Sequence, residues 1–201
     1  RAAITASATM IGMAVIVGMG GMIWSITGGF LGILQRSLGS DYLVMPPAVA
    51  VWSSNVGAKG ELANKLRAIP GVDVVSTLRY AAAVGDGQQF SLLGIDPVAY
   101  TKVASLTFTD GDPKTAYDAM ENSQAIILNG VLAAQTKLKA GDYIQLSTSR
   151  GLKTYLVAGV AGDYLNAKVV TAYISQANMW RDFHKDEDIF YQINLKPGAD
   201  P

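Results

Sequence analysis

One segment constrains this chain more than any other, because there is no charged side chain between Arg1 and Arg36. The run from Ala2 to Leu34 is rich in Ile, Val, Met, Leu, Ala and Gly. A helix needs about 20 apolar residues to cross the hydrocarbon core of a membrane, and this run is longer. A buried helix of a water-soluble domain rarely sustains such a run, and the apolar part of a signal peptide is only about 7–15 residues long. The sequence therefore predicts a transmembrane helix in preference to these two alternatives.

The predicted helix is longer than the membrane requires. A continuous helix from Ala2 to Leu38 would be about 55 Å long, whereas the hydrocarbon core is only about 30 Å thick. We expect the remaining turns, around Phe30 to Leu38, to form a stalk that ends at Gly39, because glycine adopts the left-handed conformation that ends many helices. Positive residues next to a membrane helix favour the cytoplasm, so Arg1 is expected there and residues 40–201 outside.

Small residues recur along one side of the predicted helix. Gly21, Ser25 and Gly29 are spaced by four, and so are Gly28 and Gly32. Such spacing lets a second helix approach closely and gain van der Waals contact in lipid. The alternative is that glycine is simply common in membrane helices. The pattern favours a helix-packing face.

Composition narrows the function classes. The chain has 201 residues, enough for one domain and an appendage, and only 16% of them are charged. The formal net charge is zero, whereas nucleic-acid binding normally requires a basic excess. Cysteine is absent, which excludes disulfides, thiolate metal sites and cysteine nucleophiles.

The region after Ser40 is predicted to be a mixed α and β domain. Alternating or continuous apolar stretches predict strands at 41–45, 72–84, 89–95, 125–128, 143–147, 152–160, 169–174 and 189–195. Helical spacing and breaker residues predict helices around 62–69, 113–120, 130–138 and 176–183. Gly85-Asp86-Gly87 and Ser149-Arg150-Gly151 are typical of hairpin turns. The fold class is therefore α+β, with an N-terminal membrane helix.

The sequence has few residues that could carry chemistry. The single histidine, His184, lies in the polar stretch 181–188 and is expected at the surface. There is no G-x-S-x-G elbow and no phosphate-binding G-x-x-x-x-G-K-[ST] loop. Asp110 with Asp112, and the run 186–188, are acidic clusters without EF-hand spacing, and we interpret both as solvated loops. We therefore expect no catalytic residue, no metal, no cofactor and no enzymatic activity.

Several short motifs occur in an order and at a spacing that are familiar from one family. They are Arg1 to Ala14, Ile69-Pro70-Gly71-Val72, Leu93-Gly94-Ile95-Asp96-Pro97, Ala125 to Leu138, Ala140 to Leu146 and Leu195 to Pro201. With them the chain resembles the extracytoplasmic region of an ABC transporter permease of the MacB/FtsX type, together with its preceding membrane helix. The first motif is most similar to the start of the second half of long, duplicated members.

The resemblance implies an organisation and a set of partners. It implies a transmembrane helix and stalk at 1–39 and a two-lobed MacB-like domain at 40–201, with an inserted lobe at about 96–163. The implied location is the cell membrane, as one part of a longer protein that has further membrane helices. The implied partners are a cytoplasmic ABC ATPase subunit, a second permease copy or half, membrane lipid and an extracytoplasmic protein. Motion driven by ATP would then serve export or activate that outer partner.

A second class of function stays open from the residues alone. The chain would then be a membrane-anchored sensory or protein-binding domain, and a membrane-tethered enzyme is a third reading. The sequence beyond Pro201 would separate them. A return helix with two further membrane spans favours the permease, whereas a kinase or cyclase domain favours the sensor.

Overall fold

The computed structural model describes residues 10, 12–21, 39–44, 58–162 and 168–199, and the chain divides into two compact units, Arg1–Arg36 and Ser37–Pro201. In the first unit, residues 12–21 are helical and every described side chain is exposed, including those of Met13, Ile16 and Val17. Among the residues described, no helix is both long and apolar enough to cross a membrane. Most of the expected membrane helix and its stalk lie outside the described residues and stay predictions.

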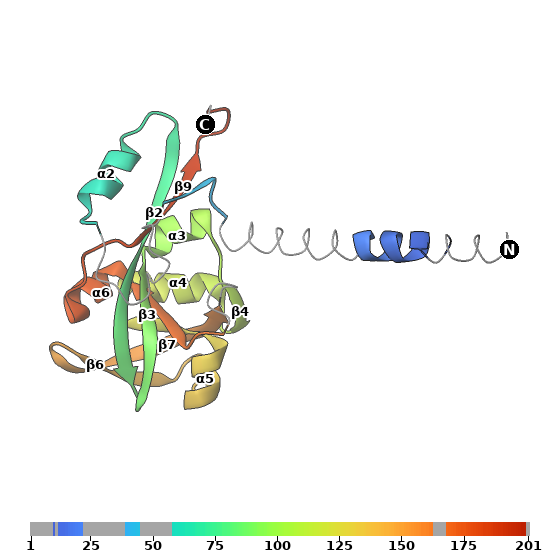
Figure 1. Cartoon of the computed structure of the whole chain (residues 1–201). Helices are drawn as coiled ribbons and strands as arrows, with labels where there is room; N and C mark the ends of the chain where they lie inside the picture. Colours follow the sequence, from blue (N-terminus) through green and yellow to red (C-terminus); the bar gives the residue numbers. More distant parts are fainter. Residues whose placement is uncertain (1–9, 11, 22–38, 45–57, 163–167, 200–201) are drawn as a thin grey trace. The chain divides into compact units, whose positions relative to one another are not determined.

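The second unit is a mixed α and β domain, as predicted (Figure 1). Its strands are β1 (Tyr42–Val44), β2 (Val72–Gly85), β3 (Gln88–Ile95), β4 (Thr107–Asp110), β5 (Ala125–Leu128), β6 (Tyr143–Thr148), β7 (Gly151–Gly162), β8 (Thr171–Ser175) and β9 (Phe190–Leu195). Its helices are α2 (Glu61–Arg67), α3 (Pro97–Val103), α4 (Pro113–Asn122), α5 (Gly130–Thr136) and α6 (Gln176–Phe183).

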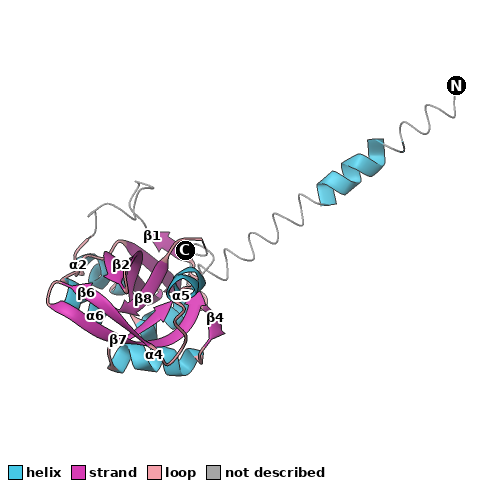
Figure 2. Cartoon of the chain, turned by 90° about the horizontal axis from the view of Figure 1, so that it is seen from below, coloured by secondary structure: helices cyan, strands magenta, loops and turns pink. Residues whose placement is uncertain are grey.

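These strands form one nine-stranded sheet in the order β1-β9-β2-β3-β8-β5-β7-β4, and β6 pairs with both β2 and β7. The pairings close six strands into a ring, β2-β3-β8-β5-β7-β6. Three strands lie outside the ring. Strand β9 pairs with the first half of β2 and also with β1, and strand β4 pairs with β7. Figure 2 shows the strongly curved strands with α4 against one side. Because successive side chains on a strand point to opposite faces, this ring has an inner and an outer surface.

The inner surface holds the largest apolar core. All six strands of the ring contribute to it, with residues such as Leu92, Ile126, Leu146 and Tyr155 that are fully buried. Leu132 of α5 and Met179 of α6 belong to the same core. The two helices therefore pack their apolar residues against the inside of the ring.

Two further cores lie around the ring. The first packs α3 and α4 against the other faces of β3, β5 and β8, with Tyr100, Met120, Ile127 and Tyr173 buried in it. The second is smaller and joins α2 to the first half of β2 and to β9. The helices α3 and α4 thus cover the same outer part of the ring, and this places them side by side (Figure 1).

The predicted elements agree with the structure in type and approximate position, with two omissions. The Asp86-Gly87 turn joins β2 to β3 with positive φ at both residues, 46° and 77°, as a two-residue hairpin with an Asp-Gly turn requires. Helix α3 and strand β4 were not predicted. The start signal for α3 is present, since Asp96 caps the helix and Pro97 occupies its first turn.

The proposed division into two lobes concerns residues 96–163. This range contributes α3, α4, α5, β4, β5, β6 and β7 to the single sheet and its covering helices. The lobe boundary stays a prediction.

Candidate functional site

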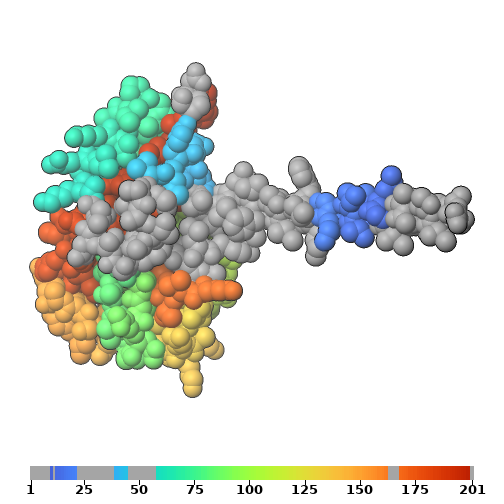
Figure 3. Space-filling model, in the orientation of Figure 1, coloured from blue at the N-terminus to red at the C-terminus, as the bar shows by residue number. Residues whose placement is uncertain are grey.

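The two ends of the second unit meet in neighbouring strands. Strand β1 pairs antiparallel with β9, so that Tyr42 lies opposite Ile193 and Val44 opposite Tyr191. In the space-filling view the light-blue atoms of β1 lie next to the red atoms of the C-terminal region (Figure 3). A force applied to the chain before β1 and a force applied after β9 therefore reach the domain at one place.

Side chains reinforce this pairing. The backbone N–H of Leu195 donates to the Asp41 carboxylate, with 2.8 Å between nitrogen and Oδ2. In return, the backbone N–H of Asp41 donates to Oδ1 of Asn194 at 3.2 Å. Hydrogen bonds with a charged acceptor are among the stronger ones. The Asp41 carboxylate therefore stabilises the pairing of β1 and β9 in addition to the backbone hydrogen bonds between the two strands.

Helix α3 is attached to the same place through its C-terminal end. The side-chain Nδ2 of Asn194 donates to the backbone oxygen of Lys102, at 3.1 Å. The last four carbonyls of a helix have no partner within the helix, and Asn194 satisfies one of them here. We call this assembly of Gly39, Asp41, Asn194, Leu195 and the C-terminal end of α3 the junction.

Gly39 packs directly against α3. Its φ is +44°, in the left-handed region, and a Cβ atom at this position would lie 2.0 Å from the backbone oxygen of Val103. Only glycine can occupy this contact without a shift of backbone. The prediction that Gly39 ends the stalk helix concerns residues before it that lie outside the described part, and it stays a prediction.

A buried ion pair lies where β2, β9 and the segment before α2 meet. Arg79 of β2 donates from Nε to Asp188 Oδ1 across 2.9 Å, and the Asp188 side chain is 3% exposed. The backbone of Asp188 also exchanges two hydrogen bonds with Ala58. The interpretation of 186–188 as a solvated loop was therefore wrong for Asp188, because its charge is compensated by a residue 109 positions away.

A second buried carboxylate, Asp182, ties α6 to the ring. It accepts hydrogen bonds from Arg181, Tyr155 and Gln124, although its side chain is only 1% exposed. Burial by itself raises the pKa of Asp182, but these hydrogen bonds outweigh burial and lower the pKa to about 2. Desolvation and the neighbouring Asp182 raise the pKa of the Tyr155 hydroxyl. The cluster is a charged network whose members are hydrogen-bonded to one another, and it ties α6 to β7 and to the residue before β5.

The residues considered for chemistry occupy structural positions. His184 is exposed, as predicted, and follows α6. Asp112 caps α4, and Asp110 accepts a hydrogen bond from the Ala140 N–H at 2.9 Å. Within the described ranges, no three His, Cys, Asp or Glu side chains are grouped to hold a metal ion.

Only one residue of the predicted helix-packing face is described. Gly21 is helical and exposed, and a Cβ atom there would meet nothing within 4 Å. The other four residues, Ser25, Gly28, Gly29 and Gly32, lie outside the described residues. The packing face therefore stays a prediction.

Sequence reasoning did not find the junction. Asp41 and Asn194 carry no motif, and their partners lie far away in the sequence. The available signals were the glycine at position 39 and the strand pattern at both ends of the domain. Neither signal says that the two strands pair with each other.

Comparison with known proteins identifies the family. The family model described as the MacB-like periplasmic core domain matches residues 2–201. The extracellular domain of the noncanonic ABC-type transporter YknZ from Gram-positive bacteria has a similar structure, with a TM-score of 0.57 and 17% identity. That match covers 78% of this chain and 83% of the YknZ domain.

A second solved structure has the same fold. It is the periplasmic region of MacB from Actinobacillus actinomycetemcomitans, with a TM-score of 0.55 and 15% identity over 79% of this chain and 75% of that one. No curated protein sequence matches. The family match covers nearly the whole chain, and both structures have the mixed α and β fold described above. The chain therefore belongs to the family of MacB-like periplasmic core domains, the extracytoplasmic domains of ABC transporter permeases of the MacB/FtsX type.

Proposed function

We propose that this domain couples ATP-driven motion of a separate ATPase subunit to export or to a protein partner outside the cytoplasm. The observation that carries the proposal is the junction, where β1 and β9 pair and share the Asp41 contacts. The family supports an ATPase partner, since such permeases belong to ABC transporters.

The physical argument concerns how displacement enters the domain. A stalk that moved at Gly39 would act on Val103 directly, because the two are in backbone contact. It would also act on β9 through the ladder and through the bond from Leu195 to Asp41. Displacement would therefore be shared between the first strand, the last strand and α3, and would not be absorbed in a loose connection.

The membrane helix is part of the same proposal. The uncharged run between Arg1 and Arg36 supports it, together with the exposed apolar side chains of residues 12–21. Arg1 would be cytoplasmic and residues 40–201 extracytoplasmic. The chain has no cysteine of its own, so single cysteines can be placed at Arg1 or at the exposed turn residue Asp86. An impermeant thiol reagent applied to intact cells should label only the Asp86 position, and labelling of Arg1 alone would reverse the orientation.

The proposal assigns this chain no catalytic step. Hydrolysis of ATP would belong to the separate ATPase subunit, because the chain has no phosphate-binding loop. Calorimetric titration of residues 37–201 with Mg-ATP should give no heat of binding. Micromolar affinity would contradict this part of the proposal.

A second permease copy or half, and membrane lipid, complete the expected assembly. The packing face would contact another membrane helix, since small residues allow close approach. Replacing Gly28 and Gly32 with isoleucine keeps the segment apolar but separates the helices, so assembly of the permease should weaken. Unchanged assembly and output would mean that these glycines are incidental.

The central test interrupts rigid attachment just before the junction. A Gly/Ser insertion of about six residues between Leu38 and Gly39 behaves as a random coil, while Gly39 itself keeps its contact with Val103. The outer domain should stay folded, the permease should assemble and ATP hydrolysis should persist, but the extracytoplasmic output should be lost. An insertion of six alanines, which favour a helix, is the matched control. Normal output from the Gly/Ser insertion would refute rigid coupling and favour a passive docking or sensory domain.

A further inference from the structure

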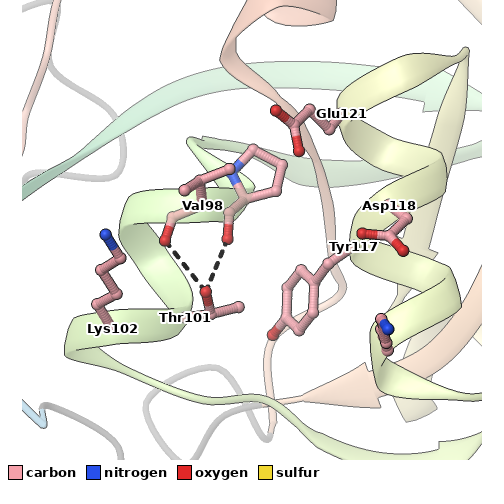
Figure 4. Close-up of a pocket in the computed structure, with 8 residues that line it drawn as sticks. Val98, Thr101, Lys102, Tyr117, Asp118 and Glu121 are labelled. Atoms are coloured by element: carbon pink, nitrogen blue, oxygen red, sulfur yellow. Dashed lines mark hydrogen bonds between the residues drawn. The ribbon is translucent and has the colours of Figure 1, made fainter.

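A groove of about 280 Å³ lies between α3 and α4. Val98, Thr101 and Lys102 form part of its α3 wall, and Tyr117, Asp118 and Glu121 form part of its α4 wall (Figure 4). Figure 4 shows the two helices as opposite walls with Tyr117 between them. Its width therefore depends on how α3 sits relative to α4.

Lys102 belongs to both the groove and the junction. Its side chain lines the groove, while its backbone oxygen accepts the hydrogen bond from Asn194. Backbone hydrogen bonds hold the short helix together: the N–H groups of Tyr100 and Ala104 donate to the oxygens of Asp96 and Tyr100, each at 2.8 Å. A displacement of the C-terminal end of α3 is therefore transmitted along the helix.

The two ends of α3 are held by different parts of the domain. At its beginning, Asp96 follows the fully buried Ile95 of the ring and caps the helix through the N–H groups of Val98 and Ala99. At its end, α3 is attached to the junction through Asn194 and Gly39. A displacement of the junction would therefore pivot α3 about its beginning.

Helix α4 has a different attachment. Its last turn ends at Ser123, whose backbone oxygen accepts a hydrogen bond from the side chain of Asn178 in α6, at 2.8 Å. Met120 and Ala116 of α4 are fully buried against the ring. Both walls of the groove have residues in the same buried core, Tyr100 and Val103 on α3 and Ala116 and Met120 on α4. The α4 wall is also attached to α6, whereas the α3 wall is also attached to the junction.

We propose that α3 is a relay that converts displacement of the junction into a change in the width of the α3–α4 groove. The inference rests on the proposed function and adds the element that carries motion into the domain. Packed interfaces move between discrete arrangements, and the helix shifts in such switching transitions are about 1–2 Å. A shift of that size at Lys102 changes the separation of the two walls.

The test follows the groove during the ATPase cycle in the full permease with its ATPase, in liposomes. Spin labels are attached to cysteines at Lys102 of α3, whose bond to Asn194 uses only the backbone oxygen, and at Asp118 of α4, and both positions are exposed. Dipolar electron paramagnetic resonance then gives the label separation without nucleotide and with trapped ATP. We expect a shift of about 2 Å in the parent. A separate fluorescent label at Asp86, read against an acceptor dye in the lipid, reports motion of the whole domain.

The informative variants remove the bond between Asn194 and Lys102. Asn194→Ala removes the donor, and Asn194→Asp removes it while keeping an oxygen that can accept the Asp41 N–H. Asn122→Ala is the matched control, because Asn122 donates in the same way to the Asp118 oxygen at 3.0 Å but stays within α4. Circular dichroism and thermal unfolding establish that each variant is folded.

The relay predicts that the groove shift is smaller in both Asn194 variants, in which only the contact between Gly39 and Val103 still joins α3 to the junction, and that it is kept in Asn122→Ala. The Asp86 signal should respond to ATP in all of them. A shift as large as that of the parent in the folded Asn194 variants overturns the relay. The relay is also overturned if the groove of the parent does not shift while its Asp86 signal responds to ATP. In that case the proposed function stands. If neither signal responds in the parent, the proposed function is wrong and the relay fails with it.

Discussion

Leu195 donates its backbone N–H to the carboxylate of Asp41 across 2.8 Å, although 154 positions separate them in the sequence. This contact joins the two strands at the ends of the extracytoplasmic domain. Under the coupling proposed above, motion of the membrane helices would enter the domain at this contact.

Replacement of Asp41 with alanine tests this contact. The hydrogen bond lies in exposed surroundings, so the free energy of unfolding should fall by less than about 1 kcal/mol. The ladder between β1 and β9 should loosen nonetheless, and amide hydrogen exchange in both strands should become faster by mass spectrometry. Asp73→Ala, which removes an exposed carboxylate of β2, is the control. Equal exchange in the parent and in Asp41→Ala would show that Asp41 does not stabilise this pairing.

Asp182 should make stability depend on acid pH. Its pKa in the folded domain is about 2, below the ordinary value of 3.8, because its hydrogen bonds outweigh burial. A carboxyl with a lowered pKa contributes stability above its unfolded pKa and loses it as pH falls from about 4 to about 2. Asp182→Asn should therefore cost about 2 kcal/mol at pH 7.

The control for this experiment is Asp118→Asn, at an exposed position of α4. Urea unfolding between pH 7 and pH 2 gives the free energy of unfolding for each protein. The difference between the parent and Asp182→Asn should shrink below pH 4, and a difference that stays constant with pH would contradict the assignment.

Gly85 should be required for closure of the ring. A Cβ atom at this position would lie 2.7 Å from Cδ2 of Leu146 and 3.2 Å from the Gln145 oxygen, where β2 meets β6. Gly85→Ala crowds the buried Leu146 side chain and the Gln145 oxygen, and overpacking of this kind costs about 1–3 kcal/mol. Gly130→Ala is the matched control, because a Cβ there meets nothing within 4 Å. Thermal unfolding should show a lower Tm for Gly85→Ala but not for Gly130→Ala. Equal Tm values for Gly85→Ala and the parent would mean that β6 accommodates the added methyl group without loss of stability.

The ion pair between Arg79 and Asp188 should show strong coupling. Arg79→Met leaves an uncompensated buried carboxylate and should destabilise the domain by about 3 kcal/mol. Adding Asp188→Leu removes that charge, so the double variant should recover most of the loss. Arg150→Met, at an exposed arginine, serves as the control for loss of a positive charge. Additive losses in a double-mutant cycle measured by urea unfolding would exclude the coupling.

Local sequence patterns predicted the elements well, because their determinants are close in the chain. Helix α6 occupies Gln176–Phe183, as predicted. Apolar alternation in β9 predicted the buried face of Ile189, Tyr191 and Ile193, which are 5%, 3% and 6% exposed. Gln192 was expected on the open face but is 6% exposed, because helix α3, to which Asn194 of the same face is hydrogen-bonded, lies against β9. Burial on that second face depends on neighbours that the alternation does not contain.

The sequence by itself determined the uncharged run at the start, the Asp86-Gly87 turn, most helices and strands, and the order of motifs that resembles the family. Each depends on residues within one element or on a turn between adjacent elements. Only the tertiary structure decided that β1 pairs with β9, that six strands close into a ring, and that Asp188 is buried against Arg79. The physical reason is that these contacts join segments that lie far apart in the sequence. Their formation depends on which apolar faces and which hydrogen-bonding groups the whole chain brings together, and strand alternation is compatible with many pairings.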